Sequence, residues 1–413
     1  MIKTIFKPAV FAMLFCIVCF SSCLKDSATK TYTVFAPVYM SKTDARNAIK
    51  SDVPKAVSTP GKIFVLGNYI FLNEVDKGIH VIDNTNPSNP INQYFIPIPG
   101  NIDLAVKGTT LYADMYRDLI AIDISNPAAI QVKKVIDNVF PARAYSNGFV
   151  SDDNGVIINW IKKDTTISIN DYRGGYLMYE DVSSSGGNSG PSSVGVPVGI
   201  AGSMARFSLV SNYLYAVTNM ELNVIDVSQP QNPVFSNILQ VGWRIETIYP
   251  FQDKLFIGSQ TGMFIYSIAD PAHPSYLSQF SHVTSCDPVI AAGDFAYVTL
   301  RTGNTCASTV NQLDILNVQD VQSPVLVKSY PLANPHGLSK SGNHLFICDG
   351  DGGLKVFDAT DANNLLLLQT ISGMKAYDII TTNNNAIVVA TDGLYQYDYT
   401  DPAHLVLRSK MGL

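Results

Sequence analysis

The sequence predicts an all-β protein built from one repeated unit, and three observations support this prediction. Of the 413 residues, 46% are hydrophobic and only 15% are charged, a balance that suits many half-buried strands. Short runs rich in Val, Ile, Tyr and Phe alternate with Gly, Asn and Pro turns along residues 57–413. One motif, Gly78-Ile-His-Val-Ile-Asp83 followed by Asn-Pro-x-x-Pro, recurs in altered form along this stretch.

The spacing of the motif identifies the unit. Its anchor is the residue that ends the third expected strand. The anchors are Asp83, Asp123, Asp181, Asp226, Ser267, Asn317, Asp358 and Asp398. A unit of about forty residues with four short strands is typical of a β-propeller blade. We therefore expect a single propeller of about eight blades, alternatively seven, because the copies around Asp181 and Asn317 depart from the pattern.

The repeated unit resembles a known family. Its consensus, Gly-Leu-x-Val-Ile-Asp-x-Ser-Asn-Pro-x-x-Pro, is similar to the LVIVD repeat, a propeller-forming motif of surface and secreted bacterial and archaeal proteins. The resemblance covers residues 57–413, and six of the eight copies match it well. It implies an extracytoplasmic β-propeller, and it implies no particular reaction.

Residues 1–22 are interpreted as a signal peptide. Lys3 and Lys7 precede an apolar run of about twelve residues, which is too short to span a bilayer as a stable helix. The run ends in Phe20-Ser-Ser-Cys23, which resembles the lipobox of Bacteroidetes-type bacterial lipoproteins; an ordinary secretory leader is the alternative. Lipidation of Cys23 would anchor the chain in the cell envelope as an outer-membrane lipoprotein, on the periplasmic or the surface face.

Residues 23–56 are expected to form a tether and an N-terminal segment in front of the propeller. Within them, Tyr32-Thr-Val-Phe-Ala-Pro-Val-Tyr39 alternates like a strand and is expected to close the ring by pairing with a terminal blade. Two repeats carry insertions. The third has a polar hairpin at Lys162–Thr166 and a Ser/Gly-rich loop at Ser183–Ser193, and the sixth is extended at Arg301–Thr309.

The cysteines agree with an oxidising compartment. Cys286 and Cys306 fall in loops of the same expected blade, where a disulfide between them is plausible. Cys348 lies in an expected strand and is interpreted as a small buried hydrophobe.

Several functional classes are disfavoured. The formal net charge of −6 argues against nucleic acid, whose phosphates require clustered Lys and Arg. No hydrolase, nucleotide-binding or zinc motif is present, the six histidines show no metal-ligand spacing, and we predict neither a metal nor a cofactor. Asp349-Gly-Asp351-Gly-Gly353 resembles a calcium loop, but Thr391-Asp392-Gly393 occupies the same place one repeat later, so a hairpin turn explains it.

One set of charged residues is a candidate site. Its members stand just before or at the start of successive first strands, so repetition should gather them near the mouth of the axial channel. They are Asp103, Arg143, Arg206, Glu246, Asp287, His336 and Asp378. Convergent charges in a cleft can bind a small ligand. The alternative is that the charges pair with one another and plug the channel.

Two functions follow. The first is a lipid-anchored binding or scaffold module that holds a glycan, peptide or protein partner through rim loops and the channel mouth, with aromatic residues such as Trp243, Tyr116 and Tyr145 available to stack on a sugar. The second is a hydrolase or lyase with a small-molecule site at the channel mouth. It would combine Glu246, Asp287 and His336, with His336 as the base and Arg206 or Arg143 holding an anion.

Overall fold

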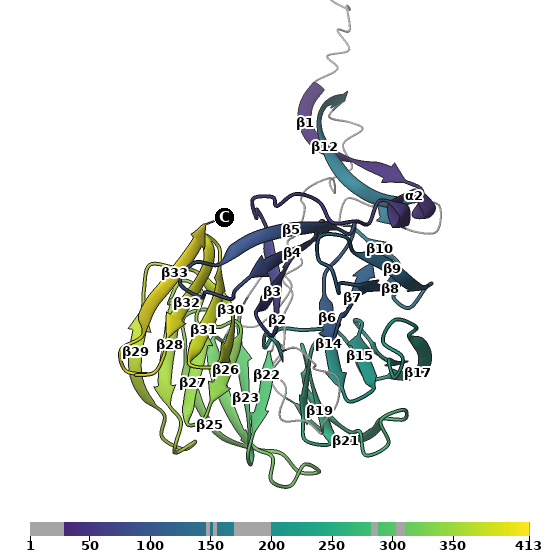
Figure 1. The fold of residues 1–413 in the computed structure, drawn as a ribbon. Helices are drawn as coiled ribbons and strands as arrows, with labels where there is room; N and C mark the ends of the chain where they lie inside the picture. Colours follow the sequence, from purple (N-terminus) through teal and green to yellow (C-terminus); the bar gives the residue numbers. More distant parts are fainter. Residues whose placement is uncertain are drawn as a thin grey trace, which may run out of the picture.

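The computed structural model describes residues 29–145, 149–151, 155–168, 200–281, 288–302 and 310–412. Within these residues, seven antiparallel four-stranded sheets are arranged as the blades of a propeller (Figure 1). The first strand of each blade lies against the first strand of the next, and β30 of the last blade lies against β2 of the first. The ring is therefore closed with seven blades.

The strands of each blade follow one another in sequence from the axis outward. Blade 1 is β2 (Pro60–Leu66), β3 (Tyr69–Glu74), β4 (Gly78–Asp83) and β5 (Ile91–Pro97). Blade 2 is β6 (Leu104–Lys107), β7 (Thr110–Met115), β8 (Asp118–Asp123) and β9 (Gln131–Ile136). Blade 3 is β14 (Phe207–Val210), β15 (Tyr213–Val217), β16 (Glu221–Asp226) and β17 (Val234–Gln240). Blade 4 is β18 (Ile245–Phe251), β19 (Lys254–Ser259), β20 (Gly262–Ser267) and β21 (Ser275–Ser281).

The remaining blades are formed in the same way. Blade 5 is β22 (Val289–Ala292), β23 (Phe295–Leu300), β24 (Gln312–Asn317) and β25 (Val325–Pro331). Blade 6 is β26 (Leu338–Ser341), β27 (His344–Cys348), β28 (Leu354–Asp358) and β29 (Leu366–Ile371). Blade 7 is β30 (Ala376–Thr382), β31 (Asn385–Ala390), β32 (Gly393–Asp398) and β33 (Val406–Gly412).

Local chemistry explains the repeated residues. The Oδ1 atom of the anchor Asp83 accepts a hydrogen bond of 2.8 Å from the Thr85 amide, a turn that ends the third strand, and Asp398 does the same with Thr400. Gly78 begins the third strand at φ +146°, and a Cβ there would lie 2.0 Å from the Ile96 carbonyl oxygen. Only glycine fits this position. Each fourth strand carries a bulge at the same place.

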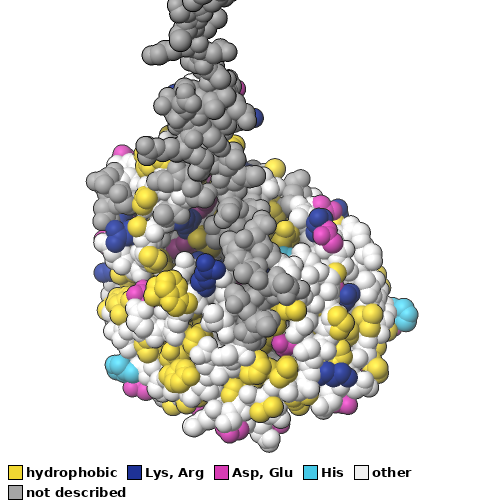
Figure 2. All heavy atoms as spheres, turned by 180° about the vertical axis from the view of Figure 1, so that it is seen from behind, with side chains coloured by type: hydrophobic (Ala, Val, Ile, Leu, Met, Phe, Trp, Pro, Cys, Tyr) yellow, Lys and Arg dark blue, Asp and Glu magenta, His cyan; other side chains and the backbone are white. Residues whose placement is uncertain are grey.

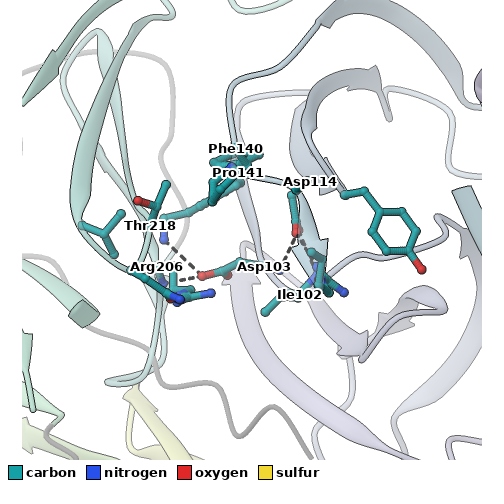
Figure 3. A pocket seen from close by; sticks show the side chains of 13 residues that line it. Ile102, Asp103, Asp114, Phe140, Pro141, Arg206 and Thr218 are labelled. Carbon is teal, nitrogen blue, oxygen red and sulfur yellow. Dashed lines mark hydrogen bonds and ion pairs between the residues drawn. The ribbon is translucent and has the colours of Figure 1, made fainter. Parts of the chain in front are cut away.

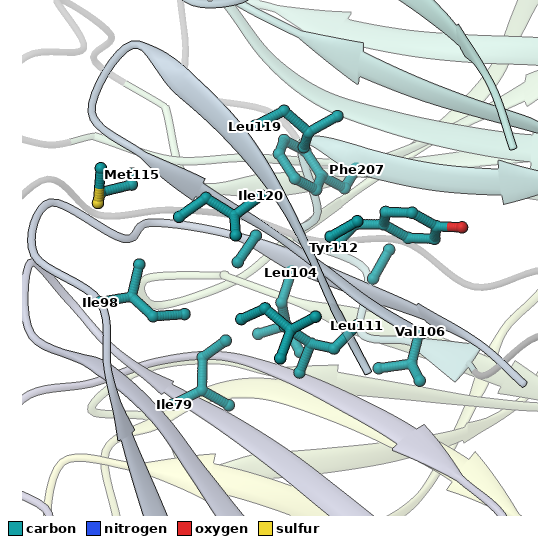
Figure 4. Close-up of a cluster of buried hydrophobic side chains, with 14 of the residues drawn as sticks. Ile79, Ile98, Leu104, Val106, Leu111, Tyr112, Met115, Leu119, Ile120 and Phe207 are labelled. Carbon is teal, nitrogen blue, oxygen red and sulfur yellow. The ribbon is translucent and has the colours of Figure 1, made fainter. Parts of the chain in front are cut away.

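The core lies between blades rather than within one. Figure 4 shows side chains of blades 1 and 2, including Ile79, Leu111 and Ile120, packed with Phe207 of blade 3. All four side chains are buried. A single blade has no partner for its apolar faces, so neighbouring blades stabilise one another.

The predicted eighth blade around Asp181 is replaced by an insertion between blades 2 and 3. Its described parts are the short pair β10 (Arg143–Ala144) and β11 (Val150–Ser151) and the long strand β12 (Val156–Ser168). Asp181 itself lies outside the described residues. The copy around Asn317, by contrast, is the regular blade 5. The seven-blade alternative is thus confirmed.

The expected ring-closing strand is wrong. Residues 32–39 belong to β1 (Thr29–Met40), which pairs with β12 as an antiparallel ribbon that projects from the ring (Figure 1). Consequently the polar stretch predicted as a hairpin within β12 is continuous strand. Blade 7 needs no borrowed strand because it supplies four of its own, and it is fastened to blade 1 by side-chain hydrogen bonds from Gln396 to Asn84 and from Ser409 to the Pro87 carbonyl.

The segment between the ribbon and the ring lies over blades 1 and 2. The helix α2 (Lys42–Asn47) begins at Ser41, whose side chain accepts a hydrogen bond from the Asp44 amide. Arg46 binds the buried Asp118 at 2.7 Å, and Asp52 forms a β-bridge with Phe95 at the outer edge of blade 1. Among the described residues, no helix is long and apolar enough to cross a membrane.

Candidate functional site

The axial channel is crossed by the chain itself. We call residues 200–206 the axial segment. It enters from the insertion as β13 (Ile200–Ala201), which pairs with the inner edge of β2, and Gly202 then donates to the Ile63 carbonyl. Ser203 accepts a hydrogen bond from the Leu338 amide of blade 6, and the Ala205 carbonyl accepts one from Ile248 of blade 4. The segment continues into blade 3, so it spans the axis and fills it.

Asp378 lies beneath this segment. Its Oδ1 atom accepts hydrogen bonds from the Ile379 amide at 2.9 Å and from the Ser203 hydroxyl at 3.5 Å, whereas its Oδ2 atom has no partner among the described residues. The residue is only 3% exposed, and burial raises the pKa of its carboxyl to about 7. A Cβ on Gly202 or Gly337 would meet the carboxylate oxygens at 2.1 and 2.3 Å, so both positions require glycine.

A buried ion pair joins blades 1 and 2 at the axis. Lys62 Nζ lies 3.0 Å from Asp103 Oδ2, and both residues are 2% exposed. Burial lowers the pKa of Lys62 to about 8 although the Asp103 charge opposes this shift. Asp103 also accepts hydrogen bonds from the backbone amides of Arg206 and Phe207. Its carboxylate thereby fixes the end of the axial segment.

Two of the three residues of the enzyme hypothesis, Glu246 and His336, lie among the described residues. Glu246 accepts a hydrogen bond of 2.8 Å from Gln260, and burial raises the pKa of its carboxyl. His336 packs edge-on against Tyr377, its Nδ1 atom is buried without a partner, and burial lowers its pKa to about 3. Such a ring is a weak base at neutral pH. Asp287 lies outside the described residues.

Arg143 precedes no blade strand, because the copy that contains it is an insertion, but it lines one cavity together with Asp103 and Arg206. It belongs to β10, in the insertion, and pairs with Asp76 over blade 1. Its guanidinium also donates to the Gly100 carbonyl at 2.7 Å and lies 3.6 Å from Asp114 and 4.9 Å from the centre of the Tyr116 ring. It fastens the insertion to the ring.

A cavity of about 190 Å³ opens between blades 2 and 3, beside the axis (Figure 3). Blade 3 and the end of the axial segment contribute Arg206, Thr218 and Asn219, and blade 2 contributes Asp103 and Asp114. Residues 140–143 of the insertion form the opposite wall. The cavity therefore forms where residues of the insertion cover the junction between blades 2 and 3.

Sequence reasoning missed Lys62, Ser203 and Asp114. For Asp114 a signal was available, because an aspartate stands near the end of the second strand in blade 2 and, one position later in the register, directly after the second strand in blade 6, as Asp349. Both carboxylates accept two consecutive backbone amides of the segment that precedes their own blade. Asp349 also pairs with Lys355 at 2.6 Å, and its backbone closes a hairpin onto Gly353. The hairpin interpretation of this stretch is confirmed.

Of the cysteines singled out in the sequence, only Cys348 lies among the described residues. Cys348 is fully buried on β27, and burial raises the pKa of its thiol. Cys286, Cys306 and Cys23 lie outside the described residues. Among those described, no cluster of three His, Cys, Asp or Glu side chains is arranged to hold a metal ion.

Comparison with known proteins identifies the repeat. Four segments match the family model of the LVIVD repeat: residues 61–93, 102–137, 201–241 and 336–370. These four segments are similar to the LVIVD repeat. Each matched LVIVD segment corresponds to one blade, namely blades 1, 2, 3 and 6, and the third match includes the axial segment. A search of curated proteins by sequence gave no match.

Solved structures share the fold of this chain. The periplasmic gluconolactonase PpgL of Pseudomonas aeruginosa is similar with a TM-score of 0.55 at 12% identity, over 85% of this chain and 96% of that one. Sqt1 of Saccharomyces cerevisiae gives 0.51 at 9% identity, over 92% and 90% of the two chains. The computationally designed protein Ika8 gives 0.50 at 11%, over 87% and 90%. At these identities the likeness shows the propeller fold alone.

Proposed function

We propose that this protein is a lipid-anchored, extracytoplasmic propeller that acts as a binding or scaffold module, and that its partner is a protein or peptide rather than a glycan. The observation that carries the proposal is the filled axis. The axial segment occupies the place where a small substrate would be processed, and Asp103 and Glu246 are bound to other residues of the chain. The outer surface therefore remains as the place for a partner.

The outer strands offer such a surface. Apolar residues are exposed at the two positions before the shared bulge in blades 3, 5, 6 and 7, with exposed fractions between 39% and 63%. They are Val234, Phe235, Val325, Leu326, Leu366, Leu367, Val406 and Leu407. Seen from behind, the ring has hydrophobic side chains gathered in several places between few charged ones (Figure 2). Recurrent exposed apolar residues on outer sheet edges are typical of protein contacts.

A glycan is less well supported. Three aromatic residues were considered for sugar stacking. Tyr116 is buried, Tyr145 is half-buried, and their hydroxyl groups are hydrogen-bonded to each other at 3.0 Å. Trp243 is the exposed one, at 67%. Of these three rings only Trp243 therefore offers its face to a sugar, whereas apolar residues recur at equivalent exposed positions in four blades.

The anchor is supported by the lipobox-like sequence and by position. Cys23 stands only six residues before Thr29, where the projecting ribbon begins. A lipid at Cys23 would therefore place the ribbon next to the membrane and leave the outer strands of the ring accessible.

Site-specific photo-crosslinking in cells tests the binding function. A photoreactive residue at Leu366 is expected to yield an adduct of defined mass with another protein. Gln131 occupies the equivalent position in blade 2 and is polar, so the same residue there is the matched control and should give no adduct. The proposal fails if apolar positions of blades 3, 5, 6 and 7 all give no adduct. In the same cells, Cys23→Ala should move the protein from the membrane fraction to the soluble one.

A further inference from the structure

We propose that the cavity between blades 2 and 3 is a binding site for a small monocarboxylate, which Arg206 holds through its guanidinium. This inference goes beyond the proposed function because it concerns a small molecule rather than a macromolecular partner, and it rests on a different part of the molecule. Four features of the cavity carry it: its size, the free donors of Arg206, the satisfied state of its carboxylates and its apolar walls.

The size suits a small organic acid. The volume is about 190 Å³. An apolar cavity of about 150 Å³ in a protein accommodates benzene, so a benzoate-sized ligand fits here. The cavity is lined by Arg206, the last residue of the axial segment, together with Asp103 and Thr218 (Figure 3).

Arg206 has unused hydrogen-bonding capacity. A guanidinium carries five N–H donors in a planar fork that matches a carboxylate. In Arg206 one of them donates to Asn219 Oδ1 at 2.8 Å, and within the described part of the chain the side chain forms no ion pair. Burial lowers the pKa of the guanidinium, although Glu246 and Asp103 at longer range oppose this shift.

The carboxylates of the cavity are already satisfied. Asp103 accepts from Lys62, from the amides of Arg206 and Phe207 and, through Oδ1, from the Leu104 amide at 2.7 Å. Asp114 Oδ1 accepts from two backbone amides and from the Asn101 side chain. The Asp114 Oδ2 atom lies 3.6 Å from an Arg143 guanidinium nitrogen, so each carboxylate already faces a cation of the chain itself. The cavity therefore offers donors.

Two neighbours add further donors. The Thr218 hydroxyl oxygen accepts from the amides of Met220 and Glu221, which leaves its O–H to donate. The Asn219 side chain uses its oxygen to bind Arg206, which leaves its NH₂ group. Together with the guanidinium, these groups form one wall of the cavity, and a carboxylate is the ligand that such a wall recognises.

The ligand should carry a single negative charge and an apolar body. Asp103 and Asp114 also line the cavity, where Arg143 lies 3.6 Å from Asp114, and the two carboxylates repel a dianion such as phosphate more strongly than a monoanion. Ile102, Phe140 and Val217 line the rest, and Phe140 stacks on Phe207 with ring centres 5.6 Å apart. An aliphatic or aromatic body would pack against these side chains.

Calorimetric titration of the purified full chain tests the proposal, with benzoate, its neutral isostere benzamide and inorganic phosphate as probes at pH 7. Benzoate should bind at least tenfold more tightly than the other two. Arg206→Gln should weaken benzoate at least tenfold. Lys134→Gln removes the same charge from an exposed residue of blade 2 and should change the affinity less than twofold. Absence of benzoate binding, equal affinity in Arg206→Gln, or tighter phosphate binding would each overturn the proposal.

A second variant protects the test against misfolding of Arg206→Gln. Ala142 is exposed at the rim of the cavity. Ala142→Phe should fill the cavity without touching any buried polar group, and it too should weaken benzoate at least tenfold. If Ala142→Phe folds and binds benzoate as the wild type does, benzoate is not in this cavity and the proposal is wrong.

Discussion

Asp378→Asn should make the protein more stable at neutral pH and change how its stability depends on pH. The carboxyl is buried at the axis, its Oδ2 atom has no partner among the described residues, and burial raises its pKa to about 7 from 3.8. An asparagine keeps the shape and the acceptor for Ile379 and Ser203 but never carries the charge.

The sign and the size follow from linkage. Between about pH 4 and pH 7 the folded state keeps a proton on Asp378 that the unfolded state has lost, so the free energy of unfolding falls as pH rises through this window. Each pH unit of difference corresponds to about 1.36 kcal/mol, so the loss over the window reaches about 4 kcal/mol. The asparagine variant avoids this loss. At pH 4 it should be as stable as the wild type or slightly less.

Urea unfolding of both proteins at half-unit steps from pH 4 to pH 8 measures the effect. The difference in free energy of unfolding between variant and wild type should rise by about 4 kcal/mol across the range, which isolates Asp378 because other groups titrate in both proteins. Asp361→Asn is the control, since Asp361 is an exposed turn residue whose pKa is lowered by hydrogen bonds from Asn363. Parallel pH curves for wild type and Asp378→Asn would refute the reasoning.

Two further predictions concern the axis. Asp103→Asn leaves Lys62 buried against a neutral group and should lower the free energy of unfolding by about 3–5 kcal/mol. Combining it with Lys62→Met should lower the free energy of unfolding by less than the sum of the two single changes, because the pair is removed together. Additive losses in urea unfolding at pH 7 would contradict this. Gly202→Ala would place a methyl group 2.1 Å from the Asp378 carboxylate and should destabilise the fold by about 1–3 kcal/mol, while Gly412→Ala, with nothing within 4 Å, should leave the melting midpoint unchanged. Equal melting midpoints for the two glycine variants would show that the axial segment can shift to accommodate the methyl group without loss of stability.

The blade itself could be predicted because its determinants are local. Asp83 bonds to an amide two residues away, and Gly78 is required by the backbone of the strand that it begins. Such features recur in the sequence wherever they recur in space. The number of blades could not be predicted in this way, since the copies around Asp181 and Asn317 both depart from the repeat pattern, and strand pairing decides which of them forms a blade. In the copy around Asp181 the described residues form an insertion. There β12 pairs with β1 rather than with a blade.

The candidate site was predictable in part for the same reason. Repetition alone indicated that Asp103, Arg206, Glu246, His336 and Asp378 approach the axis, but not what they meet there. Their partners are distant in sequence: Ser203 and Asp378 are 175 residues apart, and Lys62 and Asp103 are 41 apart. No local pattern encodes these contacts.

By itself, the sequence determined the four-stranded unit, its turns and the closed ring that such units form, because each depends on hydrogen bonds and backbone conformations within a few residues. Only the tertiary structure decided that the ring has seven blades, that residues 200–206 fill its axis and that Arg206 lies beside a cavity with donors to spare. These outcomes depend on which surfaces and strand edges remain free once the blades have packed, and that is settled by the whole chain at once.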